Sequence, residues 1–226
     1  MDKRKLLILS TLIKEHIKTG APVGSGVLVD KYKLDISPAT VRNEMAALEE
    51  EGFIMQPHTS AGRVPTEKAY NLYIESLGEK KIGKAESQAF EKLLKGKDEL
   101  SFKQAAKAIS KFSSNAVFWA FHRHNLFYTG ISNLLSQPEF AQNDLIYGIS
   151  EIIDQMDEII DKNFDQFQYG TQILLGSANP FSNLCGSIIV KYKQEGKTGI
   201  FGILGPMRMD YEKNLSLIKF ISTKLN

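Results

Sequence analysis

Apolar residues recur at helical spacing near the start of the chain and predict two helices. The stretch Lys3–Thr19 is expected to form an amphipathic helix that ends near Gly20. Its apolar stripe has spacings of 3, 4 and 4 and consists of Leu6, Leu9, Ile13 and Ile17. Gly24–Gly26 then open a short helix over Val27–Tyr32, and Lys33–Ile36 forms the turn that follows it.

A third helix is predicted from about Pro38 to Glu51. Ser37 has a side-chain oxygen that can cap an N-terminal amide, proline fits the first helical position, and Gly52 can stop the helix. One stripe of this helix must face the core, and it contains Val41, Met45 and Leu48.

The opposite face of this third helix combines small and hydrogen-bonding side chains: Ala39, Arg42, Asn43, Ala46 and Ala47. Small side chains allow the backbone to approach a major groove closely, while arginine and asparagine supply donors for base edges or phosphates. The alternative interpretation is an ordinary amphipathic helix whose solvent face is filled with alanine.

A hairpin is predicted directly after this helix. Phe53–Met55 has strand character, Pro57–Gly62 is rich in turn residues, and Arg63–Val64 returns as the second strand. Thr66 then caps a fourth helix. Polar side chains at the hairpin tip suit phosphate or minor-groove contact, since arginine binds phosphate and enters narrow grooves. In the alternative interpretation Arg63 forms only a surface ion pair.

Three helices with a tight connection between the second and third, followed by a hairpin, are the layout of a winged helix-turn-helix. We therefore expect residues 1–78 to form a DNA-binding domain. The residues expected to contact DNA are Ser25, Ser37, Ala39, Thr40, Arg42, Asn43, His58, Thr59, Ser60 and Arg63.

Residues 79–113 are predicted to form a linker and two amphipathic helices, beginning with the Lys/Gly-rich segment Gly78–Lys84. The apolar stripes of the two helices contain Phe90, Leu93 and Leu94, and Phe102, Ala106, Ile109 and Phe112. These stripes are candidates for a dimer interface. The alternative is that they cover the sheet of their own chain.

Residues 114–226 are predicted to form an α+β domain with one antiparallel sheet. The expected strands are Ala116–Phe121, Asn125–Leu135, Thr171–Leu175, Cys185–Lys193 and Thr198–Leu204. A long acidic helix is expected from about Pro138 to Asn163, with Leu145, Ile149, Ile152, Met156 and Ile160 on one stripe. A last helix is expected from Asp210 to about Leu225.

Several segments closely resemble the heat-inducible transcription repressor family, HrcA. In the first domain they are TGAPVGSGVL (Thr19–Leu28), SPATVRNEMAALEEEGFI (Ser37–Ile54) and QPHTSAGRVPTEKAY (Gln56–Tyr70). Later segments resemble the carboxy-terminal signatures of that family: NLLSQPEF (Asn133–Phe140), ANPF (Ala178–Phe181) and GILGPMRMDYEKNLSLI (Gly202–Ile218).

Family members are usually longer, with a winged helix followed by a GAF-like domain that an inserted dimerising domain interrupts. Gly78–Leu126 has no matching segment. The resemblance therefore implies a shortened member that lacks the inserted domain. Its fold class would be α+β, an N-terminal winged helix-turn-helix domain followed by a reduced GAF-like domain over residues 114–226 that serves dimerisation or regulation.

The net charge of +2 is smaller than that of many nucleic-acid binders, and residues 1–68 hold 10 basic against 9 acidic residues. Attraction to DNA must therefore come from the way the charged residues are distributed, because the local field counts for more than the net charge. Glu49–Glu51 lies at the far end of the third helix, whereas the cations expected on the DNA side are Lys3, Arg4, Lys5, Arg42 and Arg63.

A single cysteine excludes an intrachain disulfide and suits the cytosol. The sequence shows no signal peptide and no apolar run of about 20 residues, the length that spans a bilayer. We therefore expect a cytoplasmic protein without a membrane partner.

Enzymatic activity is not expected. Cys185 opens an apolar strand, where cysteine is usually a small core residue, and His122 and His124 lack further metal ligands nearby. Gly199, Gly202 and Gly205 are followed by proline and not by the Lys-Ser/Thr of a phosphate loop. No catalytic residue, metal or cofactor is therefore predicted.

The resemblance implies a homodimeric repressor of chaperone genes that binds an inverted-repeat operator in double-stranded DNA. It also implies control by the chaperonin, because unfolded clients that occupy the chaperonin would leave less of it to activate the repressor. One alternative is a small-molecule-responsive regulator that uses the GAF-like domain as its sensor. Another is a winged-helix adaptor that binds proteins and no duplex.

Overall fold

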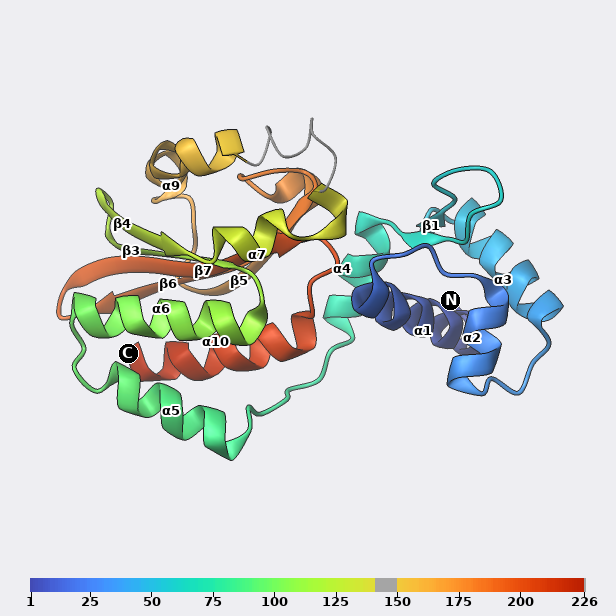
Figure 1. Ribbon diagram of the computed structural model, residues 1–226, viewed down its shortest axis with the longest axis horizontal. Coiled ribbons are helices and arrows are strands. Elements are labelled where there is room, and N and C mark those ends of the chain that lie inside the picture. The colour runs from blue at the N-terminus through green and yellow to red at the C-terminus, as the bar shows by residue number, and fades with distance from the viewer. Residues whose placement is uncertain (141–149, 226) are drawn as a thin grey trace. The chain divides into compact units, whose positions relative to one another are not determined.

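The computed structural model describes residues 1–140 and 150–225 and shows an α+β protein (Figure 1). The chain divides into two compact units, Met1–Leu77 and Gly78–Asn226. The first unit is mostly helical and has a two-stranded sheet, while the second is built on a five-stranded sheet.

The elements of the first unit lie close to their predicted boundaries. They are α1 (Lys3–Thr19), α2 (Ser25–Tyr32), α3 (Pro38–Glu50), β1 (Ile54–Met55), β2 (Val64–Pro65) and α4 (Glu67–Glu75). The helix α1 ends at Gly20, as predicted, and Gly20 itself has a left-handed backbone conformation (φ 66°). Thr66 does precede α4, but its hydroxyl lies 2.8 Å from the carbonyl oxygen of Gly52 instead of capping the helix.

The core of the first unit confirms the predicted stripe of α3 and corrects that of α1. Val41, Met45 and Leu48 are buried. The buried apolar residues of α1 are Ile8, Leu9, Leu12 and Ile13, whereas Leu6 is 41% exposed. The prediction for Leu6 is wrong because α2, α3, α4 and β2 all pack against α1 and together cover a wider face, displaced from Leu6.

The sheet of the second unit is antiparallel throughout, with strand order β4-β3-β7-β6-β5. Its strands are β3 (Ala116–His122), β4 (Asn125–Thr129), β5 (Gly170–Leu175), β6 (Cys185–Gln194) and β7 (Lys197–Pro206). Two residues with positive φ, Glu195 (49°) and Gly196 (81°), join β6 to β7 in a tight hairpin. The predicted single antiparallel sheet is confirmed.

Helices cover both faces of this sheet (Figure 1). One face carries α6 (Glu99–Ser113) and α10 (Tyr211–Leu225), and α5 (Lys84–Leu94) packs against these two helices. The other face carries α7 (Ile131–Leu135) and α9 (Met156–Asn163). The short 3₁₀ helices are η1 (Pro138–Phe140) and η2 (Gly176–Ala178).

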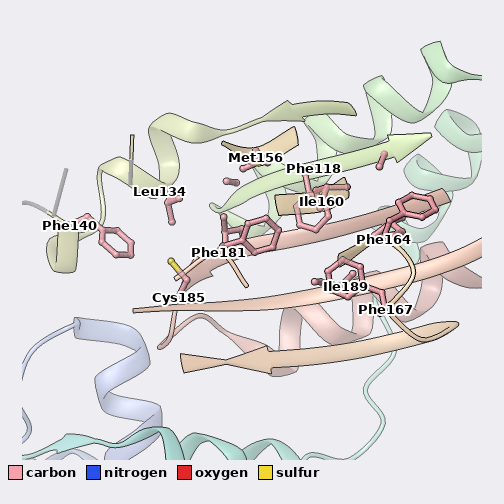
Figure 2. Packing of buried hydrophobic residues seen from close by; sticks show 14 residues of the cluster. Phe118, Leu134, Phe140, Met156, Ile160, Phe164, Phe167, Phe181, Cys185 and Ile189 are labelled. Carbon is pink, nitrogen blue, oxygen red and sulfur yellow. The ribbon is translucent and has the colours of Figure 1, made fainter. Parts of the chain in front are cut away.

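The apolar core beneath α7 and α9 joins residues from helices and strands (Figure 2). Phe118, Cys185 and Ile189 point from the sheet toward Leu134 and Ile160 of the helices. On the opposite face Trp119 stacks between two phenylalanine rings, with centroids 4.9 Å from Phe102 and 4.6 Å from Phe201. The sheet therefore has a packed core on each side.

The structure corrects two predicted elements of the second unit. The strand that begins at Asn125 ends at Thr129, because Gly130 takes a left-handed conformation (φ 76°) and α7 follows. The helix predicted from Pro138 to Asn163 is interrupted at Gln155 (φ −96°, ψ 7°) and begins with a 3₁₀ turn.

Phe140 and Met156 both enter the core under α9. At Gln155 the backbone leaves the helical conformation, so α9 starts as a separate helix that directs Met156 and Ile160 into this core. Leu145 and Ile149 of the predicted stripe lie outside the described residues.

The apolar stripes of α5 and α6 belong to the core of their own unit. Phe102 is 5% exposed and stacks on Trp119, and Leu94 is also buried. The hypothesis that these stripes form a dimer interface is therefore wrong, because α6 packs on the sheet and α5 packs on α6 and α10 within the same unit.

Candidate nucleic-acid interface

The first turn of α3 is fixed and presents polar side chains to solvent. Ser37 Oγ accepts a hydrogen bond from the backbone N–H of Thr40 at 3.1 Å, which confirms the predicted cap. Ala39, Arg42 and Asn43 are exposed. The side chains of Arg42 and Asn43 form no hydrogen bond or ion pair with any residue in 1–140 or 150–225, so their donors remain available to a ligand.

A surface groove of about 430 Å³ lies between α3 and the hairpin. Its walls are formed by Gly24, Ser25, Arg42, Met45, Gln56, Ser60, Ala61, Gly62 and Arg63. Four of the residues predicted to contact DNA therefore meet at one place: Ser25, Arg42, Ser60 and Arg63. The remaining six do not line this groove, and they lie at the start of α3 (Ser37, Ala39, Thr40, Asn43) or at the hairpin tip (His58, Thr59).

The hairpin tip is closed by a short set of hydrogen bonds. The backbone N–H of Ala61 donates to the carbonyl oxygen of His58 at 3.0 Å, and Ser60 takes a positive φ of 68°. Gln56 Nε2 donates to the carbonyl oxygen of Ala61 at 3.1 Å. Sequence analysis missed Gln56, although its place between the first strand and the turn was a signal for a role in the hairpin.

Arg63 forms an ion pair, which was the alternative to a phosphate contact in the interpretation of the sequence. Its Nε–H donates to Glu49 Oε2 at 2.8 Å, and its side chain is 23% exposed. An arginine has further N–H donors. Its contact with a phosphate therefore remains a prediction, while its contact with α3 is part of the structure.

Other cations of the first unit also meet carboxylates of α3 or of its C-terminal end. Lys5 Nζ lies 2.6 Å from Glu51 Oε1, and this hydrogen bond raises the pKa of Lys5 and lowers that of Glu51. Arg4 Nη1 lies 3.7 Å from Glu44 Oε1. Arg42 has no such partner among the described residues, so its positive charge is not offset by a direct ion pair.

Three residues that were considered for enzyme chemistry, Cys185, His122 and Gly202, lie in the second unit. Cys185 is fully buried, and burial raises the pKa of its thiol to about 12, which disfavours the nucleophilic thiolate. His122 lies at the exposed end of β3, beside its hairpin. Gly202 packs against the Phe118 ring, so this glycine serves close packing between strands.

No group of three or more His, Cys, Asp or Glu side chains within 1–140 and 150–225 is arranged to hold a metal ion. No helix within these ranges combines the length and apolar character that crossing a bilayer requires.

Fold and site together define a two-unit α+β protein in which a polar helix face and a hairpin enclose one groove. The family described as "HrcA protein C terminal domain" matches residues 41–215. The chain belongs to the HrcA family. The matched range runs through Gly78–Leu126, where sequence analysis found no resemblance.

The relatives named "Heat-inducible transcription repressor HrcA" match part of the chain. The one from Thermobifida fusca (strain YX) is 50% identical over 97 residues, which are 42% of this chain and 28% of the relative. The one from Acidothermus cellulolyticus is 52% identical over 97 residues, 42% of this chain and 29% of the relative. The matched region thus spans less than a third of either relative.

A solved structure shares the fold along the whole chain. It is the crystal structure of a hypothetical protein at 2.2 Å resolution, with a TM-score of 0.75 and 17% sequence identity, and the match covers 100% of this chain and 96% of that one. This likeness supports the α+β fold of both units.

Proposed function

We propose that the first unit is a winged helix-turn-helix domain and that the protein is a DNA-binding transcriptional repressor of heat-shock genes. The observation that carries this proposal is the pair of exposed side chains on α3, Arg42 and Asn43, which lie at the groove of the hairpin and have no partner within residues 1–140 and 150–225. Family membership supports it, since the relatives named above are heat-inducible transcription repressors.

In this proposal α3 enters the major groove and the hairpin is the wing. Arg42 and Asn43 read base edges, because arginine and asparagine form paired hydrogen bonds with guanine and adenine. Ser25, Ser37, Ala39 and Thr40 lie close to the backbone of the duplex. The wing residues His58, Thr59, Ser60 and Arg63 contact phosphates or the minor groove.

We further propose that the protein acts as a homodimer on an inverted repeat, since two-fold protein symmetry matches a palindromic operator. The second unit, which we interpret as a reduced GAF-like domain, is the proposed site of dimerisation and regulation. The chaperonin is the proposed regulatory partner, and the cytoplasm is the proposed compartment.

The proposal is tested by selecting duplexes from random-sequence DNA with the parent protein and measuring affinity by fluorescence anisotropy. Arg42→Ala and Asn43→Ala should each weaken binding by about 1–3 kcal/mol and relax base preference at one position. Light scattering with and without the selected duplex should give two chains per inverted repeat.

Thr59→Ala provides a control at the wing tip, where the side chain removed is small and uncharged. We expect it to change affinity less than Arg42→Ala. If no duplex is enriched, or if both α3 variants bind as the parent does, the proposed interface is wrong.

The alternative of a small-molecule sensor would be favoured by an enclosed pocket in the second unit. A hollow of about 190 Å³ lies there between the start of α6 and the β6–β7 hairpin, with Phe102, Phe121 and Tyr192 among its walls. It is smaller than the roughly 300–1,000 Å³ of typical ligand pockets, and its rim mixes lysine with carboxylates. This observation does not favour a sensor, and we propose the repressor function alone.

A further inference from the structure

The carboxylate of Glu49 connects α3 to both arms of the hairpin. Glu49 Oε1 accepts the backbone N–H of Gln56 at 3.1 Å, and Glu49 Oε2 accepts the Nε–H of Arg63 at 2.8 Å. Gln56 directly follows β1 and Arg63 directly precedes β2. A single side chain therefore holds the two arms at the point where they leave the sheet.

The hairpin has little to hold it in place by itself. Its ladder consists of two residue pairs, Ile54 with Pro65 and Met55 with Val64. Pro65 has no backbone N–H to donate to the ladder. Since even longer isolated hairpins are marginally stable in water, contacts with the rest of the unit must set the position of this one.

A second contact fixes the hairpin to the segment before α2. Arg63 N–H donates to the carbonyl oxygen of Val23 at 2.9 Å, and Val23 N–H donates back at 2.8 Å. Gly62 lies so close that a Cβ there would be 2.5 Å from the backbone of Val23. This contact holds one arm, whereas Glu49 ties both arms to the helix that carries Arg42 and Asn43.

We propose that Glu49 is a positioning residue for DNA recognition, setting the wing tip relative to the side chains of α3. This inference rests on the proposed DNA-binding function. Electrostatics alone predicts the opposite effect of Glu49, because a carboxylate near DNA repels phosphates and its removal should strengthen binding. The sign of the change in affinity therefore distinguishes a positioning role from that of a solvent-facing acid.

Glu50 provides a matched control. It is the next residue on α3, it is exposed, and its side chain has no hydrogen bond or ion pair with a residue of the fully described first unit. Glu49→Gln and Glu50→Gln remove the same charge from the same end of the helix. Only Glu49→Gln also turns one accepting oxygen into an amide NH₂, which faces the donor of Gln56 or Arg63 and cannot accept from it. This variant must therefore lose one of the two hydrogen bonds that hold the hairpin.

The experiment measures the affinity of the parent, Glu49→Gln and Glu50→Gln for the duplex selected by the parent, at one salt concentration. We expect Glu49→Gln to bind about tenfold more weakly, the effect of losing one charged hydrogen bond, and Glu50→Gln to bind equally well or more tightly. If both variants bind more tightly to a similar extent, Glu49 acts only as a charge and the proposal is overturned.

Amide hydrogen exchange gives a readout that is independent of DNA. The Gln56 amide should exchange faster in Glu49→Gln than in the parent, while amides of the α1 core and the thermal unfolding midpoint stay close to parent values. In Glu50→Gln the Gln56 amide should be unchanged. If the parent selects no duplex, the proposed function fails. Unchanged Gln56 exchange in Glu49→Gln overturns the role of Glu49 in holding the hairpin, whatever the DNA result.

Discussion

A buried carboxylate in the first unit illustrates how a single charged side chain depends on its partners. Glu15 is 3% exposed and accepts hydrogen bonds from Lys31 Nζ at 2.5 Å and from Tyr32 Oη at 3.2 Å. The hydrogen bond from Lys31 lowers the pKa of Glu15, although burial acts in the opposite direction. These contacts join α1 to α2, so the carboxylate stabilises the packing of the two helices.

We predict that this contact makes the first unit less stable in acid. A carboxyl whose folded pKa is lowered contributes stability above its unfolded value of 4.5, and this stability is lost as the pH falls through the lower folded value. Glu15→Gln should lower the free energy of unfolding at pH 7 by about 1–3 kcal/mol. It should also flatten the pH dependence below 4.5, as measured by urea unfolding at several pH values.

Glu50→Gln again serves as the control, because that carboxylate is exposed and without a partner in the first unit. Its unfolding curve should follow the parent at each pH. A pH dependence that is the same in Glu15→Gln and the parent would show that other carboxyls cause the acid sensitivity.

Single residues were predictable where the signal is local. Ser37 and Gly52 mark the ends of α3 because capping and chain reversal depend on neighbouring backbone groups. The pairing of Arg63 with Glu49 was not predictable, since 14 residues separate them and the register of the hairpin decides whether they meet. The sequence left both a phosphate contact and an ion pair open for Arg63; the structure shows the ion pair with Glu49, and the phosphate contact stays a prediction.

At the scale of elements, apolar runs predicted the strands of the second unit well. β6 and β7 are buried over most of their length, and their sequences are mainly apolar there, with Ser187 and Lys191 as buried polar exceptions. A recognisable turn separates the two strands. The partner of an amphipathic helix is harder to predict. The stripes of α5 and α6 would have the same pattern whether they faced a second chain or the rest of their own unit.

The packing of α6 predicts a large effect of truncating its central ring. Phe102 stacks on Trp119, and Phe102→Ala would leave a cavity against the sheet. We expect the free energy of unfolding of the second unit to fall by about 3–5 kcal/mol, measured by urea denaturation followed through Trp119 fluorescence.

Leu100 lies on the same helix but is 65% exposed, so Leu100→Ala should change stability by less than about 0.5 kcal/mol. The interface interpretation would return if Phe102→Ala kept the stability of the parent and light scattering showed that it had become monomeric.

At the scale of the whole molecule, the sheet of the second unit depends on contacts between distant parts of the chain. β3 pairs with β7, and Ala120 lies opposite Ile200, 80 residues further along. Long-range pairing of this kind closes slowly and leaves apolar strands exposed during folding. Family resemblance implied control by the chaperonin, and this topology gives a physical reason why the protein would need assistance.

We therefore predict that the chaperonin raises the amount of protein that is able to bind DNA as the proposed repressor. Denatured protein diluted into buffer with chaperonin and ATP should recover more binding to the selected duplex than without chaperonin, as measured by anisotropy. An excess of a non-native client should lower this recovery, because the client competes for the same chaperonin. Chaperonin without nucleotide is the control, since it captures unfolded chains without releasing them.

Adding the chaperonin to protein that is already native separates assisted folding from a direct effect on DNA binding. If the chaperonin acts by helping the chain to reach its folded state, adding it to native protein should leave the affinity for DNA unchanged and increase only the active fraction after dilution. Equal recovery with and without the chaperonin, and no effect of the client, would mean that this chain folds unaided. Its long-range strand pairing would then form faster than exposed strands aggregate, and regulation of the repressor would have to act on the folded protein.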